Sequence, residues 1–319
     1  MLASFQIDHP KTLNYRTDSS LPIILESQNR GFKNYVFQPH NVFMNEKGVF
    51  AYANQIKFKS QVLNSFTLED EKVLKLNNCS FLFIRQDPPF DMAYITSLHL
   101  LELLGKKVRI VNDPIGIRNA PEKILMLKFP KIIPPTLITR SINEIEKFSK
   151  EYDSLIIKPL YGNGGESVFL LTKKDKNYNQ IIENFLNKSS EPFIIQKFIP
   201  QVKNGDKRVL IVNGKPIAAV QRIPKKNDIR SNIHVGGKVI KTKLTKTDLK
   251  ICETIRDQLI ENNLFFVGID IIGNYLTEIN VTSPTCIREI DALNKVNISY
   301  IYWEEAIQLK NHRADIFAS

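Results

Sequence analysis

Short apolar runs alternate with a helix-like stretch over the first third of the chain. Leu2–Ile7, Phe81–Ile84 and Val108–Val111 have the character of buried strands, and Thr96–Leu104 is typical of a helix. Alternating strands and helices favour a mostly parallel sheet, whose ligands gather beyond the carboxyl ends of the strands. We therefore expect an α/β unit over residues 1–120.

The hydrophobic pattern then changes to one of hairpins with separate helices. Asn213-Gly214 lies between two β-rich runs and is a strong hairpin signal, and Thr245–Glu261 is a long helix introduced by a Thr-x-x-Asp capping pattern. Residues 225–238 are polar, contain turn signals and are expected to form a mobile loop. We expect an α+β unit over residues 121–319, in two parts that span about 121–200 and 201–319.

Composition limits the class of protein. The 319 residues are 43% hydrophobic and 24% charged, as in a soluble globular protein. No apolar stretch approaches the ~20 residues of a membrane span, and the N-terminal segment lacks the basic and apolar parts of a signal peptide. The three cysteines are odd in number and widely spaced, which favours reduced thiols. We expect a cytoplasmic protein with no membrane partner.

The formal net charge of +11 raises the question of a nucleic-acid partner. The lysines are dispersed in short clusters, and no basic stripe with interleaved aromatic residues is present in the sequence. This pattern indicates a solvated lysine-rich surface and no nucleic-acid partner. A basic surface would also raise the local concentration of anionic small molecules.

Two carboxylates and an amide lie near the two arms of one predicted hairpin. The segments on either side of Gly273-Asn274 are rich in β-branched and aromatic residues. Side chains alternate along a strand, so Glu278 and Asn280 must point to the same face of the hairpin. Asp270, on the other arm, points to that face only if the number of residues connecting the two arms is odd, as in a three-residue loop with a bulge. These hard oxygens suit magnesium, which proteins hold with one or two carboxylates plus substrate phosphates. The alternative is the polar face of a solvated hairpin.

A second hairpin is predicted around a glycine-rich turn. Lys158 follows one strand-like run, and Gly162, Asn163, Gly164 and Gly165 precede the next. A Walker A loop differs, because its lysine comes after the glycines and a helix follows. The amides of such a turn and the Lys158 ammonium can bind phosphate oxygens. The alternative is an ordinary glycine-rich turn.

Longer strings resemble those of one enzyme family. They are FIRQDPPFD at Phe81, IIKPLYGNGG at Ile156, GDKRVLIVNGKPI at Gly205, IRSNIHVGG at Ile229, and VGIDIIG with LTEINVTSPTCIRE from Val267. The chain resembles the bacterial-type glutathione synthetases of the ATP-grasp superfamily. The resemblance implies a Rossmann-like, substrate-binding N-terminal domain and an ATP-grasp core in which two antiparallel sheets clamp ATP. It also implies ligation of γ-glutamylcysteine to glycine through an acyl phosphate, with magnesium or manganese, in a homo-oligomer.

The resemblance implies roles for individual residues at the nucleotide end. Lys123 and Lys158 would bind the α- and β-phosphates under the glycine-rich turn. Adenine and ribose would be bound by Gln196, Lys197, Phe198, Ile199 and Asp206, and the metal ion by Asp270, Glu278 and Asn280. For the residues assigned to adenine and ribose, the alternative is a structural role alone, as part of an edge strand that enters a turn.

At the substrate end, the resemblance implies several arginines. Lys158, Arg208 and Arg222 would form the catalytic set, with Arg208 near the transferred phosphoryl group. The dipeptide and the intermediate would be bound by Arg85, Arg208, Arg222, Arg230 and Asn232, and the glycine carboxylate by Ser283 and Thr285. An exposed charge at Arg208 and a plain turn at Ser283-Pro284 are the alternatives. Ser231 stands where the family commonly has glycine or alanine. The resemblance therefore does not determine the closed conformation of this loop.

Two other functions are compatible with parts of this pattern. One is an ATP-dependent ligase that joins a different carboxylate and amine, and FIRQDPPFD together with TSPTCIRE argues against it. The other is a regulatory protein that binds nucleotide without turnover. The intact carboxylates, Lys158 and Arg208 argue against this second function.

Overall fold

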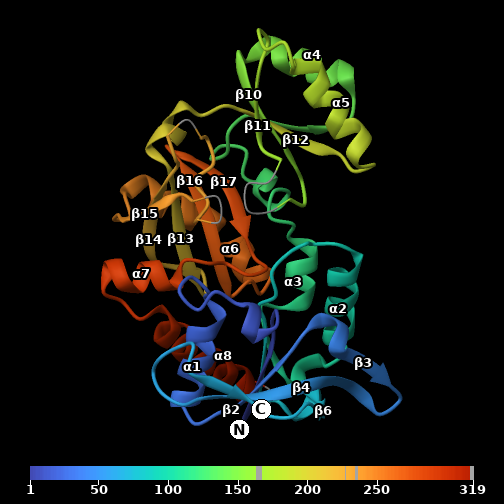
Figure 1. Ribbon diagram of the computed structural model, residues 1–319, viewed down its shortest axis with the longest axis vertical. Helices are drawn as coiled ribbons and strands as arrows, with labels where there is room; N and C mark the ends of the chain where they lie inside the picture. Colours follow the sequence, from blue (N-terminus) through green and yellow to red (C-terminus); the bar gives the residue numbers. More distant parts are fainter. Residues whose placement is uncertain (163–166, 227, 234–235, 317–319) are drawn as a thin grey trace.

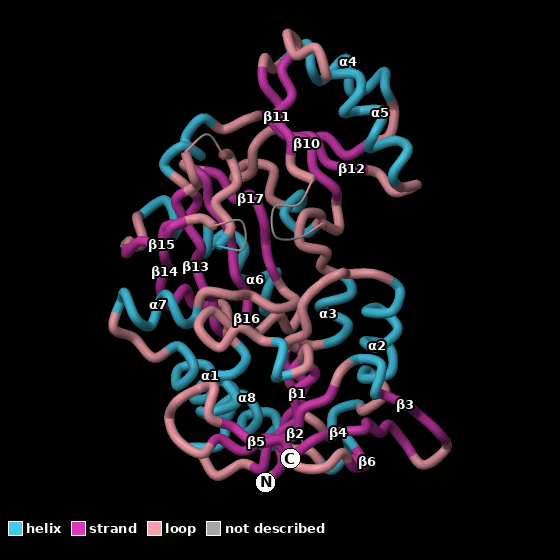
Figure 2. Tube along the Cα trace, viewed as in Figure 1, coloured by secondary structure: helices cyan, strands magenta, loops and turns pink. Residues whose placement is uncertain are grey.

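The computed structural model describes residues 1–162, 167–226, 228–233 and 236–316, with side chains up to residue 309. Figure 1 and Figure 2 show three parts stacked along the long axis: an α/β base, a central sheet and a small sheet with two helices at the top. Within these described ranges, no helix is long and apolar enough to cross a membrane.

The base is built on a sheet with the order β3-β4-β2-β1-β7-β8, and β5 and β6 pair with β4. Its strands are β1 (Leu2–Gln6), β2 (Lys33–Phe37), β3 (Val42–Asn45), β4 (Gly48–Phe58), β5 (Phe66–Leu68), β6 (Lys72–Lys75), β7 (Phe81–Ile84) and β8 (Arg109–Val111). β1, β2, β7 and β8 pair in parallel, which confirms the pairing expected for the three predicted strands. Beyond β2 the sheet continues through antiparallel pairs.

Helices cover both faces of this sheet. α1 (Ser20–Asn29) and α8 (Ile298–Ile316) pack on one face, and α2 (Met92–Glu102) and α3 (Pro114–Asn119) pack on the other. α2 begins earlier than the expected Thr96, because the Asp91 carboxylate accepts a hydrogen bond from the Tyr94 amide at 2.9 Å and caps the helix there. α8 belongs to the far end of the chain, yet it packs on the N-terminal sheet.

The small part at the top of Figure 1 has a core of its own. Its antiparallel sheet has the order β11-β10-β12-β9 and one helical layer. The elements are β9 (Thr136–Thr139), α4 (Ile142–Glu151), β10 (Ser154–Pro159), β11 (Phe169–Thr172), α5 (Tyr178–Lys188) and β12 (Phe193–Lys197). Ile145, Ile182 and Phe193 pack together between the helices and the sheet.

The central part is an antiparallel sheet with the order β15-β14-β13-β16-β17. Its elements are β13 (Asp206–Val212), β14 (Lys215–Ile223), β15 (Lys238–Lys241), α6 (Lys246–Glu261), β16 (Phe266–Ile272), β17 (Tyr275–Asn280) and α7 (Ile287–Asn294). Val212 pairs with Lys215 across the Asn213-Gly214 turn, and Thr245 and Asp248 form a capping box at α6; both predictions are confirmed. Two apolar clusters each join this sheet to the base.

Candidate active site

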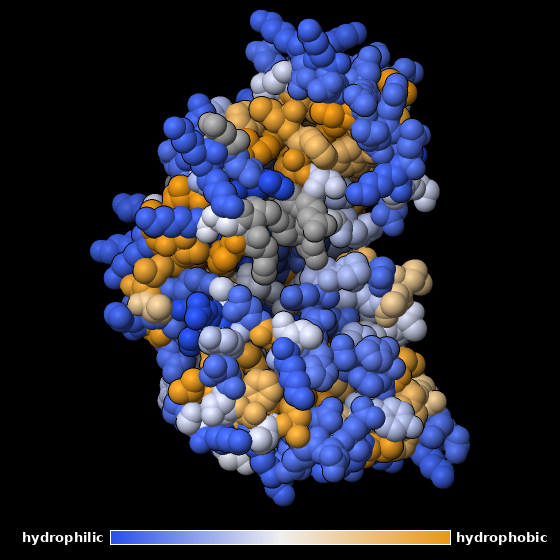
Figure 3. Space-filling view, in the orientation of Figure 1, coloured by the Kyte–Doolittle hydropathy of each residue, from blue (hydrophilic) through white to orange (hydrophobic). Residues whose placement is uncertain are grey.

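A pocket lies between the small sheet and the central sheet. Figure 3 shows the surface hollowed between the small part at the top and the rest of the molecule. The expected site residues in the lining of the pocket are Lys123, Lys158, Gly162, Gln196, Lys197, Phe198, Ile199, Asp206, Arg230, Asn232, Asp270 and Glu278. Arg85, Arg208, Arg222, Asn280, Ser283 and Thr285 are outside this lining, and Asn163, Gly164 and Gly165 lie outside the described residues.

Asp270 and Glu278 are direct cross-strand partners in the β16–β17 hairpin. The expected three-residue loop is wrong, because β16 and β17 are joined by the two-residue turn Gly273-Asn274. The register shifts by one residue at Thr277, which is the extra residue of a bulge in β17. The bulge restores the parity that a two-residue turn alone would break, so the two carboxylates still pair.

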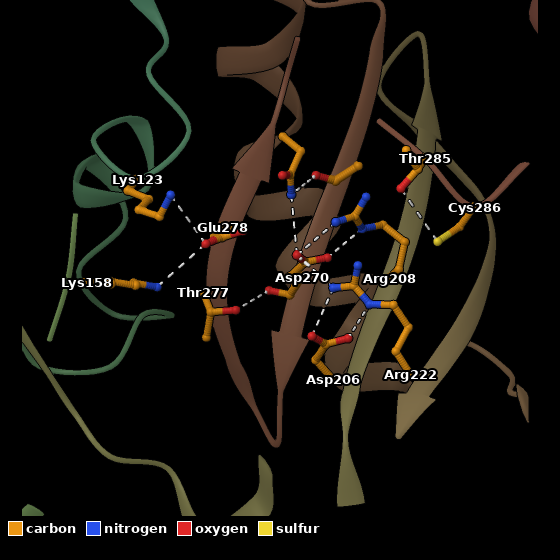
Figure 4. A network of polar contacts seen from close by, with 12 residues as sticks. Lys123, Lys158, Asp206, Arg208, Arg222, Asp270, Thr277, Glu278, Thr285 and Cys286 are labelled. Carbon is orange, nitrogen blue, oxygen red and sulfur yellow. Dashed lines mark hydrogen bonds and ion pairs between the residues drawn. The ribbon is translucent and has the colours of Figure 1, made fainter. Parts of the chain in front are cut away.

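Four buried charged side chains form a network behind the hairpin, shown in Figure 4. Arg208 donates through Nε and Nη2 to the two carboxylate oxygens of Asp270, at 2.5 and 3.0 Å. Arg222 donates in the same way to Asp206, at 2.6 and 2.9 Å. The Nη2 atom of Arg222 also lies 2.9 Å from Oδ2 of Asp270. The two positive and two negative formal charges cancel.

The two carboxylates of this network differ in pKa. Burial raises the pKa of the Asp206 carboxyl to about 6, since Arg222 only partly offsets burial and the nearby Asp270 charge. Burial acts on Asp270 in the same direction, but Arg208 and Arg222 together outweigh it and hold that pKa well below its usual range. Asp270 is therefore an anion at neutral pH. Asp206 also orients Arg222, a role that the sequence did not indicate.

Lys123 and Lys158 approach one carboxylate at the opposite side of the hairpin (Figure 4). Their Nζ atoms lie 3.6 and 3.7 Å from Oε1 of Glu278, and Lys123 also donates to the carbonyl oxygen of Gly162 at 2.5 Å. Burial lowers the pKa of Lys158, while Glu278 acts in the opposite direction. Two buried ammonium groups near Glu278, one of them bonded to Gly162, suit a polyanion such as a chain of phosphates.

Arg85 lies directly after β7, at the carboxyl end of the parallel strands, where ligands of such sheets gather. Its side chain is buried, its Nη2 donates to the Pro284 carbonyl oxygen at 2.9 Å, and its guanidinium lies over the Phe266 ring. The Nε and Nη1 atoms have no hydrogen-bond partner among the described residues. Ser283 donates its hydroxyl to the Arg85 carbonyl oxygen at 3.0 Å. Buried unpartnered donors of a cation are suited to an anionic ligand.

The remaining substrate candidates lie in two loops. Arg230 donates to the Asp228 carboxylate at 3.1 and 3.0 Å, and Arg230 and Asn232 reach the pocket beside the buried Ser231. Residues 227, 234 and 235 of the expected mobile loop lie outside the described residues. The Thr285 hydroxyl lies 3.9 Å from the sulfur of the next residue, a buried cysteine with a left-handed φ of 85°.

Asn112 supports the site, although its sequence context gave little signal beyond its place directly after a strand. Its Nδ2 donates to the carbonyl oxygens of Phe266 and Val281, each at 2.8 Å, and its Oδ1 accepts from the Phe266 amide at 2.7 Å. These bonds tie the sheet of the base to both strands of the β16–β17 hairpin, at the end opposite its turn. They position the carboxylates relative to Arg85.

The donor set of the hairpin fits magnesium. Asp270 and Glu278 line the pocket. Asn280 donates through its Nδ2 to the Gly268 carbonyl oxygen at 3.1 Å, which leaves its amide oxygen as a potential ligand. Among the described residues no group of three or more histidines, cysteines or carboxylates is placed for a metal, so such an ion would also need ligands from a substrate.

Comparison with solved structures identifies the fold of the chain. D-cycloserine synthetase DcsG is similar with a TM-score of 0.67 at 10% identity, over 98% of this chain and 99% of that one. The ATP-grasp ligase PsnB, solved with Mg, ADP and a precursor variant, is similar with a TM-score of 0.60 at 14% identity, over 96% and 97%. The chain therefore has the ATP-grasp fold, with a lysine- and carboxylate-lined pocket between two antiparallel sheets.

Family models and curated relatives identify the family. The N-terminal domain of prokaryotic glutathione synthetase matches residues 1–118, and its ATP-grasp domain matches residues 122–295. "Glutathione synthetase" of Agrobacterium fabrum is 42% identical over 98% of this chain and 98% of its own length. That of Vibrio parahaemolyticus is 36% identical over 92% and 93%. The chain belongs to the prokaryotic glutathione synthetase family.

Proposed function

We propose that the chain joins γ-glutamylcysteine to glycine and converts ATP to ADP and phosphate, with glutathione as the product. The observation that carries this proposal is the match to both domains of the family over nearly the whole chain, with the lysine and carboxylate groups assembled at one pocket. ATP first phosphorylates the dipeptide carboxylate, which is a poor acyl donor, and ADP leaves. The glycine amine then attacks the acyl phosphate, forms the C–N bond and displaces phosphate.

Negative charge gathers on phosphoryl and carbonyl oxygens in both steps, so catalysis consists mainly of positioning and electrostatic stabilisation. Lys123 and Lys158 bind the α- and β-phosphates, which replace Glu278 as their partner. Arg208 and Arg222 are held by the buried aspartates and stabilise charge near the transferred phosphoryl group. Gly162, whose carbonyl oxygen accepts from Lys123, begins the glycine-rich segment that we expect to cover the phosphates.

The nucleotide base and the ribose are bound at the end of β12. Gln196 to Ile199 line the pocket there, and their backbone supplies donors and acceptors for the adenine edge. Asp206 also lines the pocket, and its carboxylate keeps lone pairs for a ribose hydroxyl beside its bonds to Arg222. Asp270, Glu278 and Asn280 would hold magnesium or manganese, which would neutralise charge on the phosphates.

Small molecules are the partners of this site, and no nucleic acid or membrane is involved in it. The proposed arrangement places the dipeptide between Arg85 and the phosphoryl group, beneath Arg230 and Asn232, with the glycine carboxylate at Ser283 and Thr285. We also propose that the chain acts in the cytoplasm as a homo-oligomer.

Phosphate release with a panel of dipeptides and amines tests the proposed activity. We expect rapid release only with γ-glutamylcysteine and glycine together, in the presence of ATP and a divalent cation. Preference for another carboxylate–amine pair would contradict the substrate assignment, and nucleotide binding without release would contradict turnover.

Arg85→Ala is expected to raise the apparent KM for γ-glutamylcysteine roughly tenfold or more, since a charge-assisted bond contributes about 1.5 to 3 kcal/mol. The KM for ATP should change little, because Arg85 is outside the lining of the nucleotide pocket. Steady-state kinetics of Arg85→Ala and Arg85→Lys check both values, and the lysine variant retains the charge without the planar fork. A purely structural role predicts a lower melting temperature and parallel losses for both substrates, which would defeat the assignment.

Cleavage by a protease between residues 225 and 238 should slow when an ATP analogue and γ-glutamylcysteine are both bound. Ile229 to Asn232 line the pocket, so ligands there would contact this segment and exclude water from the acyl phosphate. Limited proteolysis followed by mass spectrometry measures the rate at each bond. Equal rates with and without ligands would rule out a covering role.

A further inference from the structure

The chain passes from one apolar core to another just before the glycine-rich segment. Leu155 and Ile157 of β10 lie in the core of the small part. Leu160, the first residue after this strand, is 6% exposed and belongs to the cluster that joins the base to the central sheet. Tyr161 packs against the same cluster. The two residues that lead into Gly162 are therefore anchored outside the small part.

Phe90 is the aromatic partner of Tyr161 at this boundary. The centres of the two rings are 6.1 Å apart and the ring planes differ by 24°, which is a stacked arrangement. Phe90 lies in the segment between β7 and α2, and its ring centre is also 5.2 Å from that of Tyr94. Stacked aromatic rings stabilise a contact by more than their buried area alone. The pair therefore joins the base to the segment that precedes the glycines.

On the base side, this contact leads to the proposed dipeptide site. Phe90 lies between Arg85, which we assign to the dipeptide, and Asp91, which caps α2. Tyr94 is in the first turn of that helix. Burial and then the Glu122 charge raise the pKa of Tyr94, while the Arg85 charge acts in the opposite direction, so Tyr94 is within electrostatic reach of both. The ring next to Phe90 is thus a neighbour of the dipeptide site.

On the other side, the contact leads to the proposed phosphate site. Gly162 directly follows Tyr161, and its carbonyl oxygen accepts a hydrogen bond from the Lys123 ammonium at 2.5 Å. The Nζ atom of Lys123 lies 3.6 Å from Oε1 of Glu278. Phe90, Tyr161 and Gly162 also line one small pocket together. Direct contacts between neighbouring residues therefore connect Phe90 to the ammonium group that we assign to ATP.

We propose that the stack of Phe90 on Tyr161 couples the two sites, so that bound γ-glutamylcysteine raises the affinity for ATP, and the reverse, by the same factor. A ligand at Arg85 restricts the segment that carries Phe90, and the stack transmits this restriction to Tyr161. ATP then binds beside a segment that has already lost part of its conformational freedom. Both rings are outside the lining of the nucleotide pocket, so Tyr161 is a positioning residue that acts through Gly162 and Lys123.

The coupling rests on the proposed function, because both ligands are those of the proposed reaction. It is measured by binding, without turnover. Isothermal titration calorimetry gives the dissociation constant of a non-hydrolysable ATP analogue with magnesium, without and with saturating γ-glutamylcysteine. The ratio of these two constants is the coupling factor. In the unmodified chain we expect the dipeptide to lower the constant roughly fivefold or more, as is typical of coupled sites.

Three variants test whether the stacked rings carry this coupling. Tyr161→Leu and Phe90→Leu each remove one ring and retain apolar bulk, so either should bring the coupling factor to roughly twofold or less, because the stacking contribution is lost with the ring. The double variant should match the single variants, since all three lose the same contact. Tyr161→Phe retains the ring without its hydroxyl group and should retain the coupling of the unmodified chain.

Phe43→Leu is the matched control, because Phe43 is stacked on Phe50 at 5.4 Å in the β3–β4 pair, and both rings are outside the two pocket linings described. It should leave the coupling factor unchanged. A merely structural role of the Phe90–Tyr161 pair predicts weaker binding of each ligand alone and a lower melting temperature, with the coupling factor intact, and that result would overturn the inference.

The unmodified chain separates this inference from the proposed function. Binding of both ligands with a coupling factor of one would overturn the coupling and leave the proposed function standing. Failure of the chain to bind γ-glutamylcysteine at all would overturn both. A loss of coupling in Phe43→Leu or in Tyr161→Phe would show that the stacked pair is not its carrier.

Discussion

Asp270→Asn is expected to reduce magnesium-dependent turnover on the order of 100-fold and to lower the free energy of unfolding by about 3 kcal/mol. The functional loss follows from removing the anionic partner of the proposed divalent cation and of the two arginines that we propose as catalytic. The stability loss follows from burial: Asp270 is 4% exposed and holds Arg208 and Arg222, so asparagine leaves the network with one uncompensated positive charge. The position is therefore less solvent-reachable than its place in a hairpin suggests.

Glu278→Gln separates these two effects. The Glu278 side chain is 23% exposed and contacts two lysines at 3.6 and 3.7 Å, so water can compensate part of the lost charge. We expect the apparent affinity for magnesium to fall roughly 10- to 100-fold, the range for altered surroundings of a metal ion. The free energy of unfolding should fall by about 1 kcal/mol. Initial rates over a magnesium titration and urea unfolding measure the two quantities.

Asp257→Asn provides the control for charge alone, because Asp257 is an exposed aspartate on α6. It should leave both the magnesium dependence and the unfolding free energy close to those of the unmodified chain. Unaltered magnesium dependence in Asp270→Asn and in Glu278→Gln would refute the metal assignment. Equal stability of Asp270→Asn and the control would show that the buried network carries no net stabilisation.

Trp303→Ala is expected to lower the free energy of unfolding by about 3 to 5 kcal/mol, with little change in the KM for γ-glutamylcysteine or for ATP. Trp303 is completely buried, and its ring lies 4.9 to 5.2 Å from those of Phe32, Phe81 and Phe83. Its indole nitrogen donates to the Ile23 carbonyl oxygen at 2.9 Å. Alanine would leave a large cavity between α8 and the sheet of the base and would remove this hydrogen bond.

Chemical denaturation monitored by far-UV circular dichroism measures this loss. Tyr300→Ala is the control on the same helix. Tyr300 is 50% exposed and stacks against Arg30 at the surface, so its removal should cost less than about 1 kcal/mol. Similar stability of the two variants would mean that α8 contributes little to the fold of the base.

Local patterns in the sequence predict the strands and turns that carry the site. The parallel strands at the start of the chain, the Asn213-Gly214 hairpin and the capped helix at Thr245 follow from residue spacing, because apolar periodicity and turn chemistry act over a few residues. The β16–β17 hairpin is a partial success. The two carboxylates share a face only if the number of connecting residues is odd. The Thr277 bulge adds the residue that the two-residue turn lacks, and bulges leave no distinct signal in composition.

The sequence by itself determined which chemical groups the site contains and which motifs carry these groups. They are lysines before a glycine-rich turn, carboxylates on a hairpin, and an arginine after a strand. Only the tertiary structure decided which charges neutralise each other. Asp206 meets Arg222 through strand pairing, and α8 returns from the far end of the chain to cover one face of the first sheet. These contacts join distant positions, and their stability depends on burial and charge compensation in three dimensions, which no local pattern encodes.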